Sequence, residues 1–111
     1  MIREAIIAIV NEGRDLSEDE AHAVMDEIMG GEATEAQFGS FVTALRIKGE
    51  SVDEITGMAK AMRSHALSVE IDARPLLDTA GTGGSNKVFN ASTAAAFVAA
   101  AGGAKVAKHG N

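Results

Sequence analysis

The chain contains no cysteine, no tryptophan and no tyrosine, and it has a single proline among its 111 residues. Without cysteine, disulfide bonds, thiolate metal ligands and a cysteine nucleophile are all excluded. Only four phenylalanines supply aromatic rings, so the hydrophobic core must consist mainly of aliphatic side chains. The hydrophobic content of 46% nevertheless predicts a folded protein rather than a disordered one.

Extended apolar segments are missing as well. No stretch approaches the roughly 18 apolar residues that a membrane-spanning helix requires. The N-terminal segment carries Arg3 and Glu4 within a short amphipathic pattern, which is unlike a signal peptide. We therefore expect no membrane partner, and the absence of cysteine favours a cytoplasmic location.

Basic residues are few in the first part of the chain, and acidic residues are few in the second. The net charge is −6, but residues 1–74 hold 15 acidic and seven basic residues. Residues 75–111 hold one acidic residue, Asp78, against three lysines. The acidic first part argues against a nucleic-acid partner, because phosphate binding requires a basic face. The basic second part is suited to a small anion.

Residues 1–67 show the pattern of four short helices, which predicts a small helical bundle. The last three helices each begin with a capping box, in which Ser or Thr is followed three residues later by Glu or Gln. The four helices are expected over residues 2–12 and about 18–29, from Thr34 to near Lys48, and from Ser51 to between His65 and Leu67. His22 and His65 are interpreted as helix-surface residues, because no second metal ligand accompanies either.

Apolar residues at helical spacing predict which face of each helix points inward. The predicted faces are Ile2, Ile6, Ile7 and Val10 in the first helix, Ala21, Val24, Met25 and Ile28 in the second, Phe38, Phe41, Val42 and Leu45 in the third, and Val52, Ile55, Met58, Ala59 and Met62 in the fourth.

After a polar linker at residues 68–75, which contains the single proline, the pattern changes. Leu76–Thr79 is short and apolar, as in a buried strand, and a glycine-rich loop follows at residues 81–86. Ser92 and Thr93 are expected to cap a helix that runs to Ala101, and Ala104–Ala107 predicts a second strand. This strand–loop–helix–strand order is a βαβ unit with parallel strands. The predicted fold class is therefore α plus α/β: a helical domain over 1–67 and the start of an α/β domain over 76–111. Two strands alone should leave an apolar face exposed.

The glycine loop and the residues around it predict an anion site. Backbone N–H groups in such a loop form a nest for anions, and the following helix N-terminus adds partial positive charge. Asn90, Ser92 and Thr93 stand at that terminus, and Lys108 ends the second strand, followed by His109 and Asn111. The alternative is that the loop is only a tight connection, since it matches neither the P-loop nor the GxGxxG pattern. In that interpretation, Asp78 is a strand-end residue that anchors the glycine loop.

Three motifs in order, DTAGTGG at residues 78–84, FNAST at 89–93 and VAKHGN at 106–111, resemble the anthranilate phosphoribosyltransferase family of tryptophan biosynthesis. The helical segment before them is similar to that family's N-terminal domain, so the resemblance covers the whole chain. It implies a Mg²⁺-dependent glycosyltransferase that transfers phosphoribose from phosphoribosyl pyrophosphate to the amine of anthranilate and releases pyrophosphate. It also implies a homodimer formed through the helical domain, and no covalent catalytic residue.

The resemblance also assigns site residues by position in the motifs. Those expected to bind phosphoribosyl pyrophosphate are Gly81, Gly84, Ser85, Asn90, Ala91, Ser92, Thr93 and Lys108. The hydroxyl of Ser92 is expected to bind Mg²⁺ as well. The residues expected to border anthranilate are Gly81, His109 and Asn111.

The sequence departs from the family pattern in two respects. Ser85 stands where the family usually has Asp, Val88 stands where a hydroxyl residue is common, and the loop is about one residue shorter. Family chains also continue well beyond the position of Asn111, with a later acidic pair for Mg²⁺ and a later Arg for the anthranilate carboxylate. We therefore expect an N-terminal portion that is inactive alone. The alternatives are a non-catalytic helical dimerisation module and a relative of the pyrimidine nucleoside phosphorylases.

Overall fold

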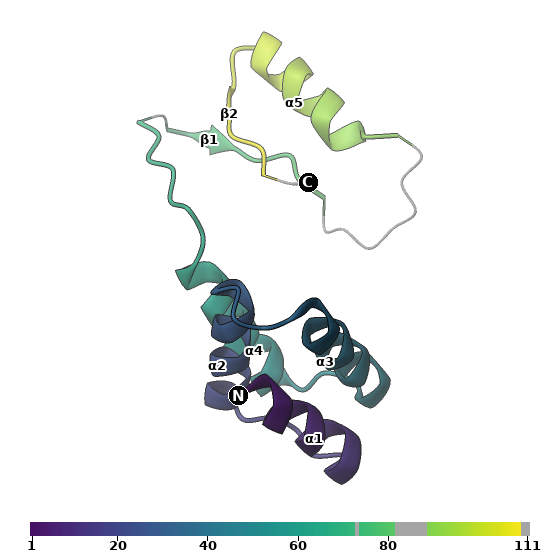
Figure 1. Ribbon diagram of the computed structural model, residues 1–111. Coiled ribbons are helices and arrows are strands. Elements are labelled where there is room, and N and C mark those ends of the chain that lie inside the picture. The colour runs from purple at the N-terminus through teal and green to yellow at the C-terminus, as the bar shows by residue number, and fades with distance from the viewer. Residues whose placement is uncertain (73, 82–88, 110–111) are drawn as a thin grey trace. The chain divides into compact units, whose positions relative to one another are not determined.

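The computed structural model describes residues 1–72, 74–81 and 89–109. The chain divides into two compact units, Met1–Ser68 and Val69–Asn111, which are drawn together in Figure 1. The first unit contains the helices α1 (Ile2–Glu12), α2 (Glu18–Met29), α3 (Glu35–Lys48) and α4 (Val52–Ser64). The second contains the strands β1 (Leu76–Leu77) and β2 (Lys105–Val106) with the helix α5 (Ala91–Ala101) between them. The predicted fold class, a helical bundle followed by the start of an α/β domain, is confirmed.

Local capping signals determine where the helices of the first unit begin and end. All three predicted capping boxes form: Ser17, Thr34 and Ser51 each accept a hydrogen bond from the backbone N–H three residues later, and the side chain at that position accepts one from the backbone N–H of the cap residue. These bonds satisfy N–H groups that have no partner within the helix. Helix α1 ends at Gly13, whose φ of 62° lies in the left-handed region that glycine tolerates.

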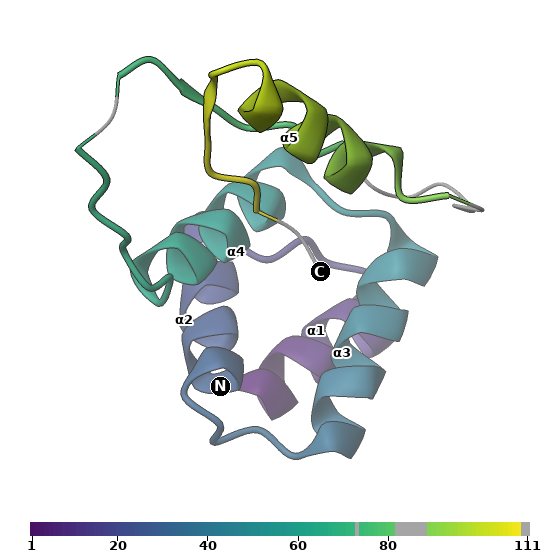
Figure 2. The same ribbon diagram turned by 90° about the horizontal axis from the view of Figure 1, so that it is seen from above.

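Two pairs of helices make up the bundle. Helix α4 packs against α2, and α1 packs beside α3, as Figure 2 shows from above. The core is mostly aliphatic, with Phe41 as its single fully buried aromatic ring among the described residues. The residues that form this core are Ile2, Ala5, Ala8, Ile9, Leu16, Ala21, Val24, Phe41, Ala44 and Leu45.

The predicted inward faces are right for α2 and only partly right for α1 and α3. In α2, Ala21, Val24 and Met25 are buried and Ile28 packs against the core. In α1, Ala5, Ala8 and Ile9 are buried beside Ile2, whereas the predicted Ile7 and Val10 are exposed and Ile6 is only partly buried. In α3, Phe41 and Leu45 are buried, but Phe38 and Val42 are exposed.

The predicted face of α4 was wrong. Its buried residues are Glu54, Gly57 and Ala61. The predicted Val52, Ile55, Ala59 and Met62 are exposed, and Met58 is only partly buried. The physical reason is the close approach of α4 to α2: a side-chain carbon at Gly57 would overlap the carbonyl oxygen of Glu18 and lie 2.9 Å from the backbone nitrogen of His22. Small residues must face α2, so the larger apolar residues face away from it.

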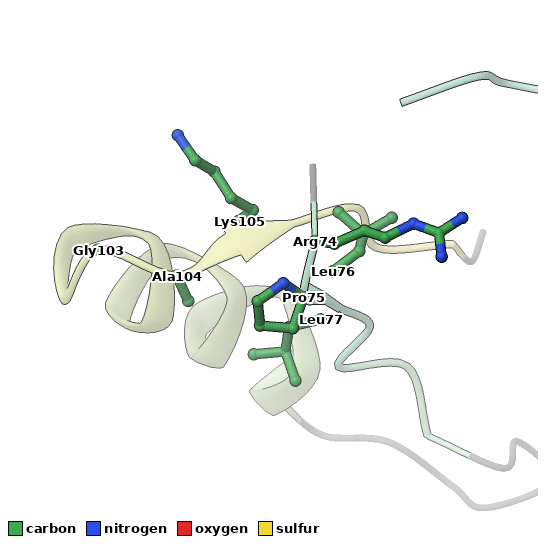
Figure 3. A pocket seen from close by; sticks show the side chains of 7 residues that line it. All are labelled: Arg74, Pro75, Leu76, Leu77, Gly103, Ala104 and Lys105. Carbon is green, nitrogen blue, oxygen red and sulfur yellow. The ribbon is translucent and has the colours of Figure 1, made fainter. Parts of the chain in front are cut away.

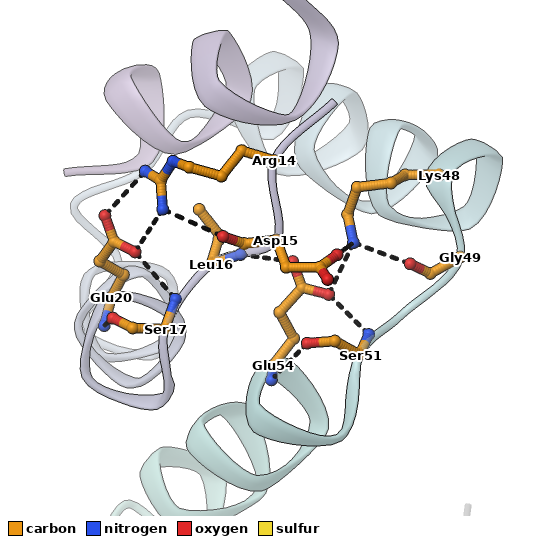
Figure 4. Close-up of polar contacts among 9 residues, drawn as sticks. All are labelled: Arg14, Asp15, Leu16, Ser17, Glu20, Lys48, Gly49, Ser51 and Glu54. Carbon is orange, nitrogen blue, oxygen red and sulfur yellow. Dashed lines mark hydrogen bonds and ion pairs between the residues drawn. The ribbon is translucent and has the colours of Figure 1, made fainter. Parts of the chain in front are cut away.

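A buried carboxylate joins α4 to two connecting segments (Figure 4). The side chain of Glu54 is fully buried. It accepts hydrogen bonds from Leu16 N at 2.9 Å, Ser51 N at 2.7 Å and Lys48 Nζ at 2.9 Å. Lys48 also donates to the carbonyl of Gly49 at 2.8 Å and pairs with the carboxylate of Asp15. Burial alone would raise the pKa of Glu54, but these donors outweigh it and hold the pKa below its ordinary value of 4.5.

A second carboxylate, Glu20, stands at the matching capping-box position of α2, but its side chain is 41% exposed (Figure 4). Arg14 binds it with two hydrogen bonds of 2.9 Å. Mainly because of Arg14, and then the backbone N–H of Ser17, the pKa of Glu20 falls to about 2.

In the second unit, β1 and β2 pair in parallel, with Leu76 opposite Lys105 and Leu77 opposite Val106. Both strands are shorter than predicted. Apolar side chains are exposed in this unit, as expected: Leu76, Leu77, Phe97 and Val98 are all exposed, Phe97 to 75%.

Candidate functional site at the carboxyl end of the strand pair

The predicted site residues follow the carboxyl ends of two neighbouring parallel strands. The pairing continues past the strands, since the N–H of Ala107 donates to the carbonyl of Leu77 at 3.0 Å. The segment 78–81 therefore leaves β1 beside the segment 107–109, which leaves β2. This edge of a parallel sheet is where ligands bind in open α/β folds.

The N-terminus of α5 supplies the third part of the site. Asn90 is the N-cap, and its Oδ1 accepts a hydrogen bond from Thr93 N at 3.2 Å. The prediction that Ser92 and Thr93 cap the helix is therefore wrong: both lie in the first turn, because Asn90 already satisfies the N–H of Thr93. Negative charge is favoured beside this first turn by the helix dipole.

Two contacts hold the 78–81 segment against the start of α5. The hydroxyl of Thr79 donates to the carbonyl oxygen of Ser92 at 2.8 Å. A side-chain carbon at Gly81 would lie 3.7 Å from the hydroxyl oxygen of Ser92, an ordinary van der Waals separation. The structure thus brings Gly81 and Ser92, two of the predicted phosphoribosyl pyrophosphate ligands, next to each other.

Asp78 connects the 78–81 segment to the 107–109 segment. One carboxylate oxygen accepts a hydrogen bond from Ala80 N at 2.9 Å, and the other pairs with Nδ1 of His109. Mainly because of the Ala80 N–H, and then because of His109, the pKa of Asp78 lies below its ordinary value of 3.8. The bond to Ala80 agrees with the interpretation of Asp78 as an anchor of its loop. The pairing with His109 was missed, although the adjacency of the two strand ends was a signal for it.

Lys108 is half-buried, and its Nζ donates to the carbonyl oxygen of His109 at 2.9 Å. This bond uses one of the three donor hydrogens of the ammonium group, and the predicted contact with a ligand stays a prediction. Gly84, Ser85 and Asn111 lie outside the described residues, so their predicted contacts are not placed. The predicted site residues that the structure places at this edge are Gly81, Asn90, Ala91, Ser92, Thr93, Lys108 and His109.

A pocket of about 510 Å³ lies at the opposite, amino end of the strands (Figure 3). Its lining comes from residues 74–77 and 103–105. The two cationic side chains in this lining, Arg74 and Lys105, extend away from each other in Figure 3. The two side chains therefore do not point toward one common ligand, and the candidate site remains the carboxyl end of the strands.

Comparison with known proteins identifies the class to which this architecture belongs. The helical bundle domain of the glycosyl transferase family matches residues 4–66, and the a/b domain of the same family matches residues 73–111. The chain therefore belongs to this glycosyl transferase family.

Individual members of this family are similar to the chain over its whole length. The chain is 59% identical over 111 residues to the anthranilate phosphoribosyltransferase of Roseiflexus sp. (strain RS-1), covering 99% of this chain and 32% of that protein. It is 54% identical over 112 residues to the anthranilate phosphoribosyltransferase of Thermoanaerobacter sp. (strain X514), covering 100% of this chain and 33% of that protein. The chain thus spans about a third of the length of the curated relatives that it matches.

A solved structure is similar as well. The crystal structure of anthranilate phosphoribosyltransferase from Thermus thermophilus matches with a TM-score of 0.74 and 46% sequence identity, over 99% of this chain and 32% of that one. Within the part of the chain that the structure describes, no helix has both the length and the apolar character needed to cross a membrane.

Proposed function

We propose that the chain supplies the first part of a phosphoribosyl pyrophosphate site in an anthranilate phosphoribosyltransferase of tryptophan biosynthesis. The observation that carries the proposal is the meeting of the 78–81 segment, the α5 N-terminus and the 107–109 segment at one edge of the strand pair. Support also comes from the identity of 54–59% to enzymes of that name. The same identity favours this function over that of a nucleoside phosphorylase.

The proposed reaction forms a bond between the amine nitrogen of anthranilate and the anomeric carbon of the ribose. The bond from that carbon to pyrophosphate breaks, pyrophosphate leaves with the bonding electron pair, and the amine nitrogen loses one proton to the solvent. A site for this chemistry must orient two substrates and stabilise the negative charge of the leaving group. Backbone N–H groups at residues 81, 84 and 85, the α5 N-terminus at 90–93 and the ammonium of Lys108 would serve the pyrophosphate. Gly81, His109 and Asn111 would border anthranilate, and no covalent catalytic residue is involved.

Mg²⁺ is proposed to accompany the pyrophosphate, whose negative charge it would neutralise. Among residues 1–72, 74–81 and 89–109, no group of three or more His, Asp or Glu side chains could hold a metal ion. The Ser92 hydroxyl fits as one oxygen ligand, and the phosphate oxygens suit Mg²⁺ as further ligands.

A homodimer through the helical unit is also proposed. Exposed apolar side chains support it, namely Ile7 and Val10 on α1, Phe38, Val42 and Ile47 on α3, and Val52, Ile55 and Met62 on α4. Exposed apolar patches commonly mark association surfaces. Sedimentation equilibrium that returned only monomer at high concentration would contradict this proposal. A cytoplasmic location is proposed because the sequence lacks cysteine.

Calorimetric titration of the chain with phosphoribosyl pyrophosphate and Mg²⁺ tests the proposed site. We expect saturable binding, and we expect Lys108→Met to weaken it about tenfold, since one charged hydrogen bond contributes about 1.5 kcal/mol or more. Lys105→Met is the matched control, because Lys105 lies in β2 and lines the pocket at the opposite end. Absence of binding by the unmodified chain, or equal weakening by both variants, would contradict the proposal.

A further inference from the structure

The Asp78 carboxylate is the one described acidic group at the carboxyl edge of the strand pair, and both of its oxygens are engaged by the two segments that flank the candidate site. Oδ1 accepts a hydrogen bond from the N–H of Ala80, which precedes Gly81. Oδ2 pairs with the imidazole of His109. The Thr79 hydroxyl, bonded to the Ser92 carbonyl, ties the same segment to α5. Residues 78 and 79 thus connect all three parts of the site.

The pairing determines which nitrogen of His109 carries the proton. An ionised carboxylate only accepts hydrogen bonds, and the lowered pKa of Asp78 keeps it ionised at neutral pH. Nδ1 of His109 must therefore donate to it. In a neutral imidazole the other nitrogen is then an acceptor, so Nε2 is presented as an acceptor on a side chain that is 76% exposed.

We propose that Asp78 is a positioning residue that fixes His109 in the tautomer with its proton on Nδ1, so that Nε2 accepts a hydrogen bond from a substrate N–H. The identity of this substrate rests on the proposed function, in which the acceptor substrate carries an amine. A hydrogen bond from the amine N–H to Nε2 would orient the amine so that the lone pair of its nitrogen is free for bond formation. Asp78 would act on the substrate only through His109 and the Ala80–Gly81 backbone.

The experiment measures the protonation of each imidazole nitrogen by ¹⁵N NMR of the full 111-residue chain in weakly alkaline buffer without substrate. We expect His109 to carry its proton on Nδ1. In Asp78→Asn, an NH₂ group replaces one of the two carboxylate oxygens. This group donates, so the side chain can no longer accept both hydrogen bonds. The population of His109 with its proton on Nδ1 should therefore fall markedly. A proton on Nε2 in the unmodified chain, or an unchanged His109 in Asp78→Asn, would overturn the proposal.

A matched control comes from the helical unit, where His65 Nε2 pairs with Asp26 Oδ1 at 2.7 Å. Asp26→Asn should alter the signals of His65 and leave those of His109 unchanged. The amide signals of α5 report whether Asp78→Asn retains the fold of the second unit. If that fold is lost, the tautomer of the unmodified chain decides the question, because that measurement needs no variant.

Substrate titration separates this inference from the proposed function. If the unmodified chain fails to bind phosphoribosyl pyrophosphate with Mg²⁺, the proposed function fails and the tautomer result stands. If it binds, Asp78→Asn should weaken the binding of anthranilate to the chain loaded with phosphoribosyl pyrophosphate about tenfold, because the amine loses its acceptor at Nε2 of His109. Undiminished binding of anthranilate by Asp78→Asn would overturn the positioning role while leaving the proposed function intact.

Discussion

Replacing Gly57 with alanine should lower the free energy of unfolding of the helical unit by about 2–3 kcal/mol, as expected for an overpacked interface. The added carbon would overlap the backbone of α2 at Glu18 and His22. Backbone atoms cannot rotate aside as a flexible side chain does, so α4 must shift away from α2. The gain of up to about 1 kcal/mol in helix propensity is smaller than this cost. Urea denaturation followed by circular dichroism measures the loss.

Gly39 provides the matched control for this prediction. It also lies within a helix, α3, but a side-chain carbon there would meet nothing within 4 Å. Gly39→Ala should therefore stabilise the unit by about 0.5–1 kcal/mol through helix propensity alone. Equal effects of the two substitutions, in either direction, would contradict the close packing of α4 on α2.

Replacing Glu54 with glutamine should cost about 3 kcal/mol, because it removes one partner of a buried ion pair. Lys48 is only 11% exposed and would lose its buried carboxylate partner. The glutamine NH₂ group would also face a donor, either the N–H of Leu16 or the donors Ser51 N and Lys48 Nζ. Urea denaturation at neutral pH measures the loss.

The capping box itself does not explain this cost. In α3 the equivalent position is naturally Gln37, which completes its box. Glu20→Gln in α2 is the control, since the Glu20 side chain is 41% exposed, and it should cost less than about 1 kcal/mol. A cost for Glu54→Gln as small as that for Glu20→Gln would show that the buried network contributes little.

The effect of Glu54→Gln should also depend on pH. The pKa of Glu54 is lower in the folded chain than its ordinary value of 4.5. The stability that its charge contributes is therefore fully present above pH 4.5 and is lost as the pH falls below that value. The difference between Glu54→Gln and the unmodified chain should shrink over the same range. A difference that stays constant down to about pH 3 would contradict the assignment of the cost to the charge.

Sequence predicts the helix boundaries here because capping is local. The partners Ser17 and Glu20, or Ser51 and Glu54, stand three residues apart and require no knowledge of the tertiary fold. The inward faces require such knowledge. In α4 the deciding residue is Gly57, which has no apolar side chain to count, and its burial depends on how closely α2 approaches.

In the candidate site, too, some features follow from local sequence and others depend on the tertiary fold. The order of strand, loop and helix predicted that residues after β1 and β2 would meet at one edge, because parallel strands end together. The pairing of Asp78 with His109 spans 31 residues and depends on the strand register. The capping role of Asn90 was missed because Ser92 and Thr93, two residues that also favour caps, follow it closely.

The proposed function requires the carboxyl edge of the strand pair to bind the pyrophosphate of phosphoribosyl pyrophosphate. Backbone amide NMR signals of the ¹⁵N-labelled chain, recorded during titration with phosphoribosyl pyrophosphate and Mg²⁺, report on this binding residue by residue. We predict saturable changes in the 78–81 segment, at 90–93 and in the 107–109 segment, with the signals of α1–α4 unchanged. Unchanged signals in those three segments, or changes centred on residues 1–68, would contradict the proposed site.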